Sequence, residues 1–281
     1  MEIPGVDNCF VTIDGVTLHY MHAGSGRPLV MLHGMGASSV AWRDNILPLS
    51  RHFSVYALDA PAHGDSDASV PDYAPKAMAR LLVRFLEELG LTGSVLIGNS
   101  MGGGLAALAA YEAPHMVDGL VLVATVGITP KIPLFIKLAT VPILGEVLWL
   151  RALPRDQALL RVIFNDPRFA EKELAEELAR TRNRPGAKLA VLKALRAGVG
   201  FSGLKPDTLM VPKLATMLIP VVVVWGAQDR IMPVDLGYQA KKLMPAWDLH
   251  IFDQCGHWPQ MEKAEEFNKL VKSFVSARLP A

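Results

Sequence analysis

The chain has few cysteines and almost no net charge. Cys9 and Cys255 are the two cysteines among 281 residues, and neither has the spacing of metal ligands or of a disulfide-rich scaffold. We therefore expect a reducing compartment, the cytoplasm. The formal net charge is +1, and the sequence has no basic stripe or acidic tail. Nucleic acids and strongly acidic partners are not expected.

Signals for export or membrane insertion are also lacking. The first residues carry no basic region followed by an apolar core, so we expect no signal peptide. Residues 132–150 are mostly apolar over about the length of a membrane span, but Lys137, Pro142 and Gly145 interrupt them. This pattern predicts two short amphipathic helices that break near Pro142, and no stable membrane insertion.

Short apolar segments that alternate with helical ones are abundant. Hydrophobic residues make up 51% of the chain, which is long enough to bury one large core. Segments that read as buried strands lie at 29–32, 54–59, 94–97, 120–124, 221–225 and 249–252. Strands that are apolar on both faces predict a mostly parallel sheet covered by helices on both sides. An Asp14-Gly15 turn predicts an antiparallel hairpin over residues 10–21.

The alternation of strand and helix segments stops between the apolar segments 120–124 and 221–225. Helical patterns follow one another at 133–150, 155–163, 169–182 and 187–198. We predict a core formed by residues 1–127 and 212–281, with a helical cap, residues 128–211, inserted after the sixth strand. The alternative is a second independent domain, but these helices are too few and too apolar to be stable alone.

The most informative motif is Gly98-Asn99-Ser100-Met101-Gly102. It follows the apolar segment 94–97 and precedes a helix rich in small residues. A serine between strand and helix with glycines two positions away is typical of a nucleophile elbow, because a Cβ at either glycine would clash in so sharp a turn. The alternative is a glycine-rich turn in which Ser100 only caps the helix.

A nucleophilic serine needs a general base and a group that orients the base. Asp229 lies just past segment 221–225, and His257 lies just past segment 249–252. Their order, Ser100 then Asp229 then His257, is the order expected for this sheet architecture. We predict that Ser100 attacks a carbonyl carbon, that His257 transfers the proton, and that Asp229 orients the ring. Asp253 is a competing acid, but it is too close to His257 in the chain to reach its ring.

Attack on a carbonyl creates an oxyanion that needs two hydrogen-bond donors. We assign the backbone N–H of Met101, at the start of the helix, and that of Met35, in the tight loop His33-Gly34-Met35-Gly36. Among the other histidines, His63 lies in a turn-rich loop that it could orient. The rest, His19 included, have no partner at ligand spacing, so we expect no metal.

Together these residues resemble the α/β-hydrolase superfamily over about residues 8–127 and 212–278. The marks of the resemblance are the 33–36 loop, the 59–66 loop, the elbow, Gly226-Ala227-Gln228-Asp229 and Gly256-His257. The resemblance implies an α/β-hydrolase fold with an eight-stranded, mostly parallel sheet, no cofactor, and hydrolysis through an acyl-enzyme or a related adduct.

Two branches of that superfamily compete. Asn99, Trp258 and the following Glu262 are similar to the meta-cleavage-product hydrolases, which cleave a carbon–carbon bond in vinylogous keto acids and bind the substrate carboxylate with a cap arginine. Arg180, Arg182 and Arg184 are the candidates for that arginine. The branch usually has a Gly-Gly-Pro-Gly type oxyanion loop, where this chain has Gly34-Met35-Gly36-Ala37.

A carboxylesterase needs only the three catalytic residues, the oxyanion donors and an apolar pocket. We predict a hydrophobic ester as substrate, with a meta-cleavage keto acid as the alternative, and a pocket that includes Gly34, Asn99 and Trp258. The apolar cap residues either line that pocket or pack onto the core; they are Leu134, Phe135, Leu138, Ile143, Leu144, Leu148 and Trp149. The sequence leaves open whether the chain forms homo-oligomers.

Overall fold

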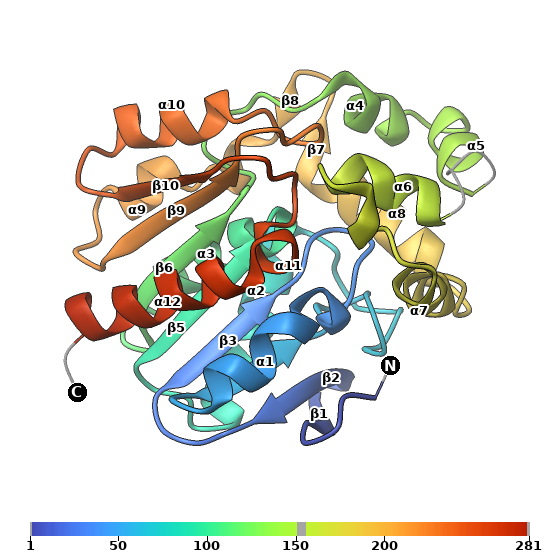
Figure 1. Ribbon diagram of the computed structural model, residues 1–281. Helices are drawn as coiled ribbons and strands as arrows, with labels where there is room; N and C mark the ends of the chain where they lie inside the picture. Colours follow the sequence, from blue (N-terminus) through green and yellow to red (C-terminus); the bar gives the residue numbers. More distant parts are fainter. Residues whose placement is uncertain (1, 151–155, 280–281) are drawn as a thin grey trace.

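A single eight-stranded sheet organises the computed structural model, which describes residues 2–150 and 156–279, without the side chains of 148–150 (Figure 1). The spatial order of the strands is β1-β2-β4-β3-β5-β6-β9-β10. β1 and β2 pair antiparallel, β2 pairs antiparallel with β4, and every later neighbour is parallel. This is the α/β-hydrolase fold predicted from the sequence.

The strand bounds follow the apolar segments of the sequence closely. They are β1 Asp7–Ile13, β2 Val16–Ala23, β3 Pro28–Leu32, β4 Ser54–Leu58, β5 Ser94–Asn99, β6 Val117–Val123, β9 Val221–Gly226 and β10 Asp248–Phe252. The predicted hairpin is confirmed: Asp14 and Gly15 have φ of 51° and 77°, as a tight hairpin turn requires.

Helices cover both faces of the sheet. α2 (Pro75–Glu88), α3 (Met101–Glu112) and α10 (Asp235–Leu243) contribute to one buried apolar cluster, and α1 (Arg43–Ser50) and α12 (Ala264–Arg278) contribute to the other. The strands between them are therefore buried on both sides, which explains why their sequences do not alternate.

The segment between β6 and β9 carries most of the remaining helices (Figure 1). They are α4 Leu134–Thr140, α5 Leu144–Leu150, α6 Asp156–Ile163, α7 Lys172–Arg182, α8 Ala187–Gly198 and α9 Val211–Leu214. A two-stranded hairpin that the sequence did not predict, β7 (Val199–Gly200) with β8 (Gly203–Leu204), follows α8. We call residues 128–211 the cap.

The apolar run at 132–150 forms two helices separated at Pro142, as predicted. No helix among the described residues is long and apolar enough to cross a membrane. The alternative that these residues pack onto the core is wrong for three of them, because Leu134 is 69%, Phe135 54% and Ile143 80% exposed. Leu138 and Leu144 are exposed as well, and the side chains of Leu148 and Trp149 lie outside the described part.

A different part of the cap packs onto the core. Ile163 and Phe164 at the end of α6, together with Leu174 and Leu178 of α7, form a buried apolar cluster with Trp258. Val40 and Ala41, beside the loop that follows β3, and Met261 in α11 (Pro259–Glu262) complete the contact. The cap therefore shares a hydrophobic core with the loops after β3 and β10.

This packing predicts a large difference between two phenylalanines of the cap. Phe164 is 1% exposed and Phe201 is 96% exposed. Phe164→Ala should lower the free energy of unfolding by about 3–5 kcal/mol, whereas Phe201→Ala, the matched control, should leave it nearly unchanged. Urea unfolding followed by circular dichroism measures both, and equal effects of the two variants would contradict the packing described above.

Candidate active site

Ser100 stands in a strained turn between β5 and α3. Its φ is 54° and its ψ is −113°, a conformation that costs a residue other than glycine free energy. A Cβ on Gly98 would lie 2.4 Å from the backbone of Gly102, and a Cβ on Gly102 would lie 2.3 Å from the carbonyl oxygen of Leu32. The prediction that both flanking glycines must be small is therefore confirmed.

Asp229 and His257 come together from the loops after β9 and β10. The Nδ1 of His257 lies 2.7 Å from Oδ2 of Asp229, and both residues are buried. The other carboxylate oxygen of Asp229 accepts the N–H groups of Ile231 and Met232, each at 2.8 Å. Because an ionised carboxylate only accepts, Nδ1 of His257 is the donor in this bond.

A side chain adjacent to Ser100 connects the elbow with the histidine loop. The amide of Asn99 donates to the carbonyl oxygen of His257 at 3.1 Å and to that of Val123 at 3.3 Å. The strands β9 and β10 run parallel to β5, so both predicted partners of Ser100 lie at the same carboxyl-terminal edge of the sheet. The Asn99 amide fixes the backbone of His257 to the end of β5.

The loop after β3 lies directly over the elbow. A Cβ on Gly34 would lie 3.0 Å from Oδ1 of Asn99 and 3.3 Å from Cβ of Ser100, so a larger residue would press on both side chains. Met35 follows in the same loop. Met101 is the first residue of α3, where backbone N–H groups have no partner within the helix. The loop that carries Met35 and the first turn of α3 thus both adjoin Ser100, and the assignment of the two N–H groups as oxyanion donors stays a prediction.

The remaining predicted site residues have clear environments. Trp258 is buried and packs edge-to-face on Phe164, with ring centroids 5.6 Å apart. Asp253, the competing acid, accepts a hydrogen bond from Nε2 of Gln228 at 3.1 Å, and this bond lowers its pKa. Asp229, not Asp253, contacts the ring of His257.

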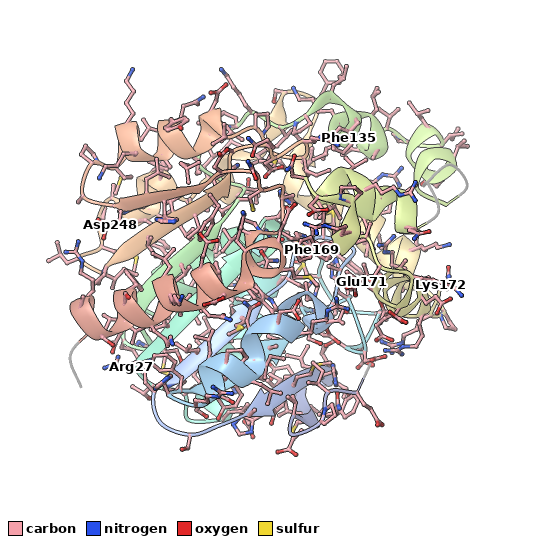
Figure 2. The ribbon with its side chains drawn as sticks, viewed as in Figure 1. Arg27, Phe135, Phe169, Glu171, Lys172 and Asp248 are labelled. Carbon is pink, nitrogen blue, oxygen red and sulfur yellow. The ribbon has the colours of Figure 1, made fainter. Side chains whose placement is uncertain are left out.

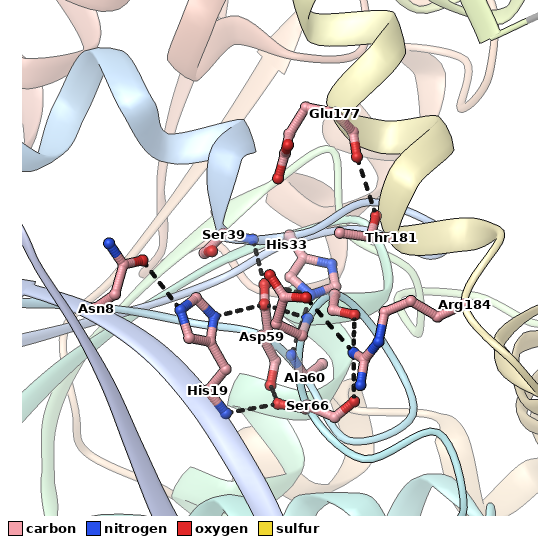
Figure 3. A network of polar contacts seen from close by, with 12 residues as sticks. Asn8, His19, His33, Ser39, Asp59, Ala60, Ser66, Glu177, Thr181 and Arg184 are labelled. Carbon is pink, nitrogen blue, oxygen red and sulfur yellow. Dashed lines mark hydrogen bonds and ion pairs between the residues drawn. The ribbon is translucent and has the colours of Figure 1, made fainter. Parts of the chain in front are cut away.

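Asp59 forms the centre of a second buried network (Figure 3). Its carboxylate accepts Nδ1–H of His19 at 2.7 Å and the N–H groups of Ser39 and Asp65 at 2.5 and 2.7 Å. Burial opposes ionisation of Asp59, but the hydrogen bond from His19 and the positive potential of His33 outweigh it and lower the pKa. This network joins the loop after β3 to the loop after β4.

The sequence-based statement that His19 has no partner at ligand spacing is corrected here. One ligand atom from each of His19, Asp59 and Asp65 lies within 4.8 Å of the others. The donors named above already occupy the Asp59 oxygens, and Arg180 occupies the carboxylate of Asp65. The chemistry of the group is therefore that of a hydrogen-bonded ion-pair network rather than of open metal ligands.

Three arginines of the cap connect it to the core. Arg180 makes a bidentate pair with Asp65, and Arg184 donates to the carbonyl oxygens of Gly64 and Ser66. Nε of Arg182 donates to the carbonyl oxygen of Gly36 at 2.8 Å, within the loop that carries Met35. Of the three candidate arginines, Arg182 alone has a hydrogen bond recorded to that loop among the described residues.

Glu262, the last residue of α11, has structural contacts that its place in the family resemblance did not indicate. Its side chain is buried, and its carboxylate accepts the N–H of Gly256, next to His257, at 2.6 Å. Burial and then the negative charge of Glu262 raise the pKa of the Cys255 thiol, which therefore stays protonated. The sequence signal for this residue is an acid that lies five positions after His257, next to apolar residues.

Comparison with known proteins assigns the chain to a family. Residues 27–264 match the family model for the alpha/beta hydrolase fold. The chain belongs to the α/β-hydrolase family. It is 34% identical over 277 residues, 94% of this chain and 93% of the relative, to the 2-hydroxy-6-oxononadienedioate/2-hydroxy-6-oxononatrienedioate hydrolase of Burkholderia vietnamiensis. This α/β-hydrolase is thus related to enzymes named as hydrolases over nearly its whole length.

Two solved structures are similar to this α/β-hydrolase. Cfl2 from Burkholderia cenocepacia has a TM-score of 0.86 and 25% identity, covering 97% of this chain and 98% of its own. A bacterial membrane phospholipase A has a TM-score of 0.79 and 27% identity, covering 99% of this chain and 88% of its own. The fold is therefore shared with a protein that is named as a phospholipase.

The crowded elbow predicts that one methyl group will disrupt the site. Gly102→Ala should lower the free energy of unfolding by about 1–3 kcal/mol or prevent folding, because backbone atoms of Leu32 and His33 cannot rotate away. Gly200→Ala, whose new Cβ would meet its nearest atom at 3.8 Å, is the control. Chemical unfolding of both variants tests this, and a Gly102→Ala protein as stable as the control would refute it.

The buried histidines predict a loss of stability in acid. Burial lowers the pKa of His63 from 6.5 to about 3. Below pH 6.5 the unfolded chain therefore binds a proton that the folded chain does not, and the free energy of unfolding falls by up to about 1.4 kcal/mol per pH unit. His63→Gln should reduce this slope between pH 6.5 and 4, with His115→Gln on the surface as the control. Urea unfolding at several pH values measures it, and parallel curves for the wild type and His63→Gln would argue against it.

Proposed function

We propose that the chain is a serine hydrolase that cleaves carboxylic esters with a hydrophobic acyl or aryl group. Ser100 attacks the ester carbonyl, and Nε2 of His257 takes the serine proton and passes it to the departing alcohol. Asp229 holds the imidazole tautomer and stabilises its charged form. The N–H groups of Met35 and Met101 stabilise the oxyanion, and water then releases the acid from the acyl-enzyme by the same steps in reverse.

One observation carries this proposal. A serine in a strained turn has beside it an Asn99 amide bonded to the backbone of a histidine, whose Nδ1 is in turn bonded to a buried aspartate. A turn that only capped α3 would need neither the base nor the acid. The free cysteines, Cys9 and Cys255, fit the cytoplasm as the compartment of this activity.

The cap arginines favour an ester over a keto acid. Arg180 and Arg184 are bonded to the 64–66 loop, and Arg182 donates to the loop that carries Met35. A substrate carboxylate would compete with these protein acceptors. An uncharged ester makes no such demand. The likeness to a phospholipase, an ester hydrolase by its name, supports the same choice.

The ester proposal predicts large and specific losses of activity. Ser100→Ala and Asp229→Asn should each lower kcat on p-nitrophenyl esters by about 10⁴-fold. The first variant lacks the nucleophile, and the second no longer holds the required tautomer of His257. Asp253→Asn, the matched control for the second acid, should retain the wild-type rate. Turnover of esters of graded acyl length is the measurement, and equal rates for wild type and Ser100→Ala would exclude the mechanism.

The second candidate is hydrolysis of a carbon–carbon bond in a 2-hydroxy-6-oxo-dienoate. The relative from Burkholderia vietnamiensis, which is named for such substrates, supports it. A carboxylate bound by Arg182 would have to compete with the carbonyl oxygen of Gly36, to which its Nε donates. Decay of a coloured dienoate should then be fast, and Arg182→Met should raise the KM for the dienoate by more than the KM for an uncharged ester. No decay of the dienoate alongside ester turnover would remove this candidate.

A further inference from the structure

Glu262 is a buried carboxylate that the proposed mechanism does not use. It is 7% exposed, and three backbone N–H groups donate hydrogen bonds to its carboxylate. Oε2 accepts from Gly256 at 2.6 Å and from Asn165 at 3.2 Å, and Oε1 accepts from Asp166 at 2.5 Å. One side chain therefore joins the histidine loop to the segment that follows α6 in the cap.

Backbone contacts bring the same two segments together. The N–H of His257 donates to the carbonyl oxygen of Ile163 at 2.7 Å. A Cβ on Gly256 would lie 2.2 Å from that oxygen and 2.8 Å from the nitrogen of Asn165, so the two backbones are in direct contact. The residue that carries the imidazole is thus bonded through its own backbone to the cap.

We propose that Glu262 is a positioning residue that couples the cap to the general base His257. It fixes residues 165–166 on one side and Gly256 on the other. The His257 ring is therefore positioned for proton transfer from Ser100 only while the cap is packed against the histidine loop. The inference rests on the proposed function, because it assigns Glu262 a part in the reactivity of Ser100 through His257.

The chemistry of the site requires a carboxylate. Three N–H groups converge on Glu262, and an ionised carboxylate offers only acceptors. Glutamine has one acceptor oxygen and a donor NH₂ group, which would face at least one of these N–H groups and leave it buried without a partner. Aspartate keeps both acceptors but is one methylene shorter, so it reaches the cap and the histidine loop less well.

A role in folding alone makes a different prediction. Loss of the bonds would then lower the melting temperature while folded protein kept the wild-type reactivity of Ser100. A positioning role lowers reactivity in protein that is fully folded, because a displacement of about 1 Å in a catalytic group can cost roughly a hundredfold in rate. The rate of a well-folded variant separates the two roles.

The experiment compares Glu262→Gln, Glu262→Asp and Glu265→Gln with the wild type, at a temperature well below all four melting temperatures. Glu265 is exposed and pairs with Lys269, so Glu265→Gln is the matched control. The measurements are kcat and KM on a p-nitrophenyl ester and the rate at which a fluorophosphonate labels Ser100. Labelling needs the nucleophile and its base but no particular substrate.

We expect Glu262→Gln to lower kcat and the labelling rate together by about tenfold or more, with KM nearly unchanged. Glu262→Asp should recover part of the loss, and Glu265→Gln should match the wild type. Wild-type kcat and labelling in folded Glu262→Gln would overturn the inference, as would a change in melting temperature alone. If Glu262→Gln does not fold, Glu262→Asp decides: a lowered labelling rate supports the coupling, and a wild-type rate refutes it.

The two proposals fail in different ways. Wild-type protein that labels with the fluorophosphonate but hydrolyses no ester contradicts the ester proposal, while the labelling rates of the variants still decide the role of Glu262. Wild-type protein that hydrolyses esters, with Glu262→Gln as fast, removes only the coupling. Absence of labelling in the wild type contradicts both.

Discussion

The crowding of the backbone around Gly98 and Gly102 is the constraint on which the site depends. β5 turns into α3 within one residue, so a side chain at Gly98 would meet the backbone of Gly102, and one at Gly102 would meet the backbone of Leu32 in β3. The turn forces Ser100 into its strained conformation and brings the β3 loop over it. The predicted base and acid follow β9 and β10 of the same sheet, and the carboxyl ends of its parallel strands meet at one edge.

Two buried carboxylates hold the loops around this edge, and they do so mainly through backbone N–H groups. Asp59 joins the loops after β3 and β4, and Glu262 joins the loop after β10 to the cap. Neither contacts the predicted nucleophile. Because a loop has no ladder of hydrogen bonds to fix it, an internal acceptor with several donors provides the rigidity that a catalytic site needs. Exposed ion pairs contribute little to stability by comparison. An example is the pair that Lys172, labelled in Figure 2, forms with Glu176.

The sequence was sufficient where a local pattern determines the structure. The Asp14-Gly15 hairpin, the apolar strands and the elbow each follow from a few adjacent residues, and the positions of Asp229 and His257 follow from the rule that loops after parallel strands share an edge. The sequence was insufficient where contacts between distant segments determine the structure. Nothing near Leu134 or Phe135 indicates that they face solvent while Phe164 is buried. The partners of His19 and Glu262 become visible only when segments up to about a hundred residues apart meet.

The position of the cap in the chain has a consequence for synthesis. β9 and β10, and with them Asp229 and His257, leave the ribosome only after the whole cap has been made. A nascent chain that ends before β9 already contains the complete elbow, but neither its base nor its orienting acid. The two last strands add to the edge formed by β6. The predicted nucleophile therefore remains without its predicted base at least until the whole cap has been synthesised.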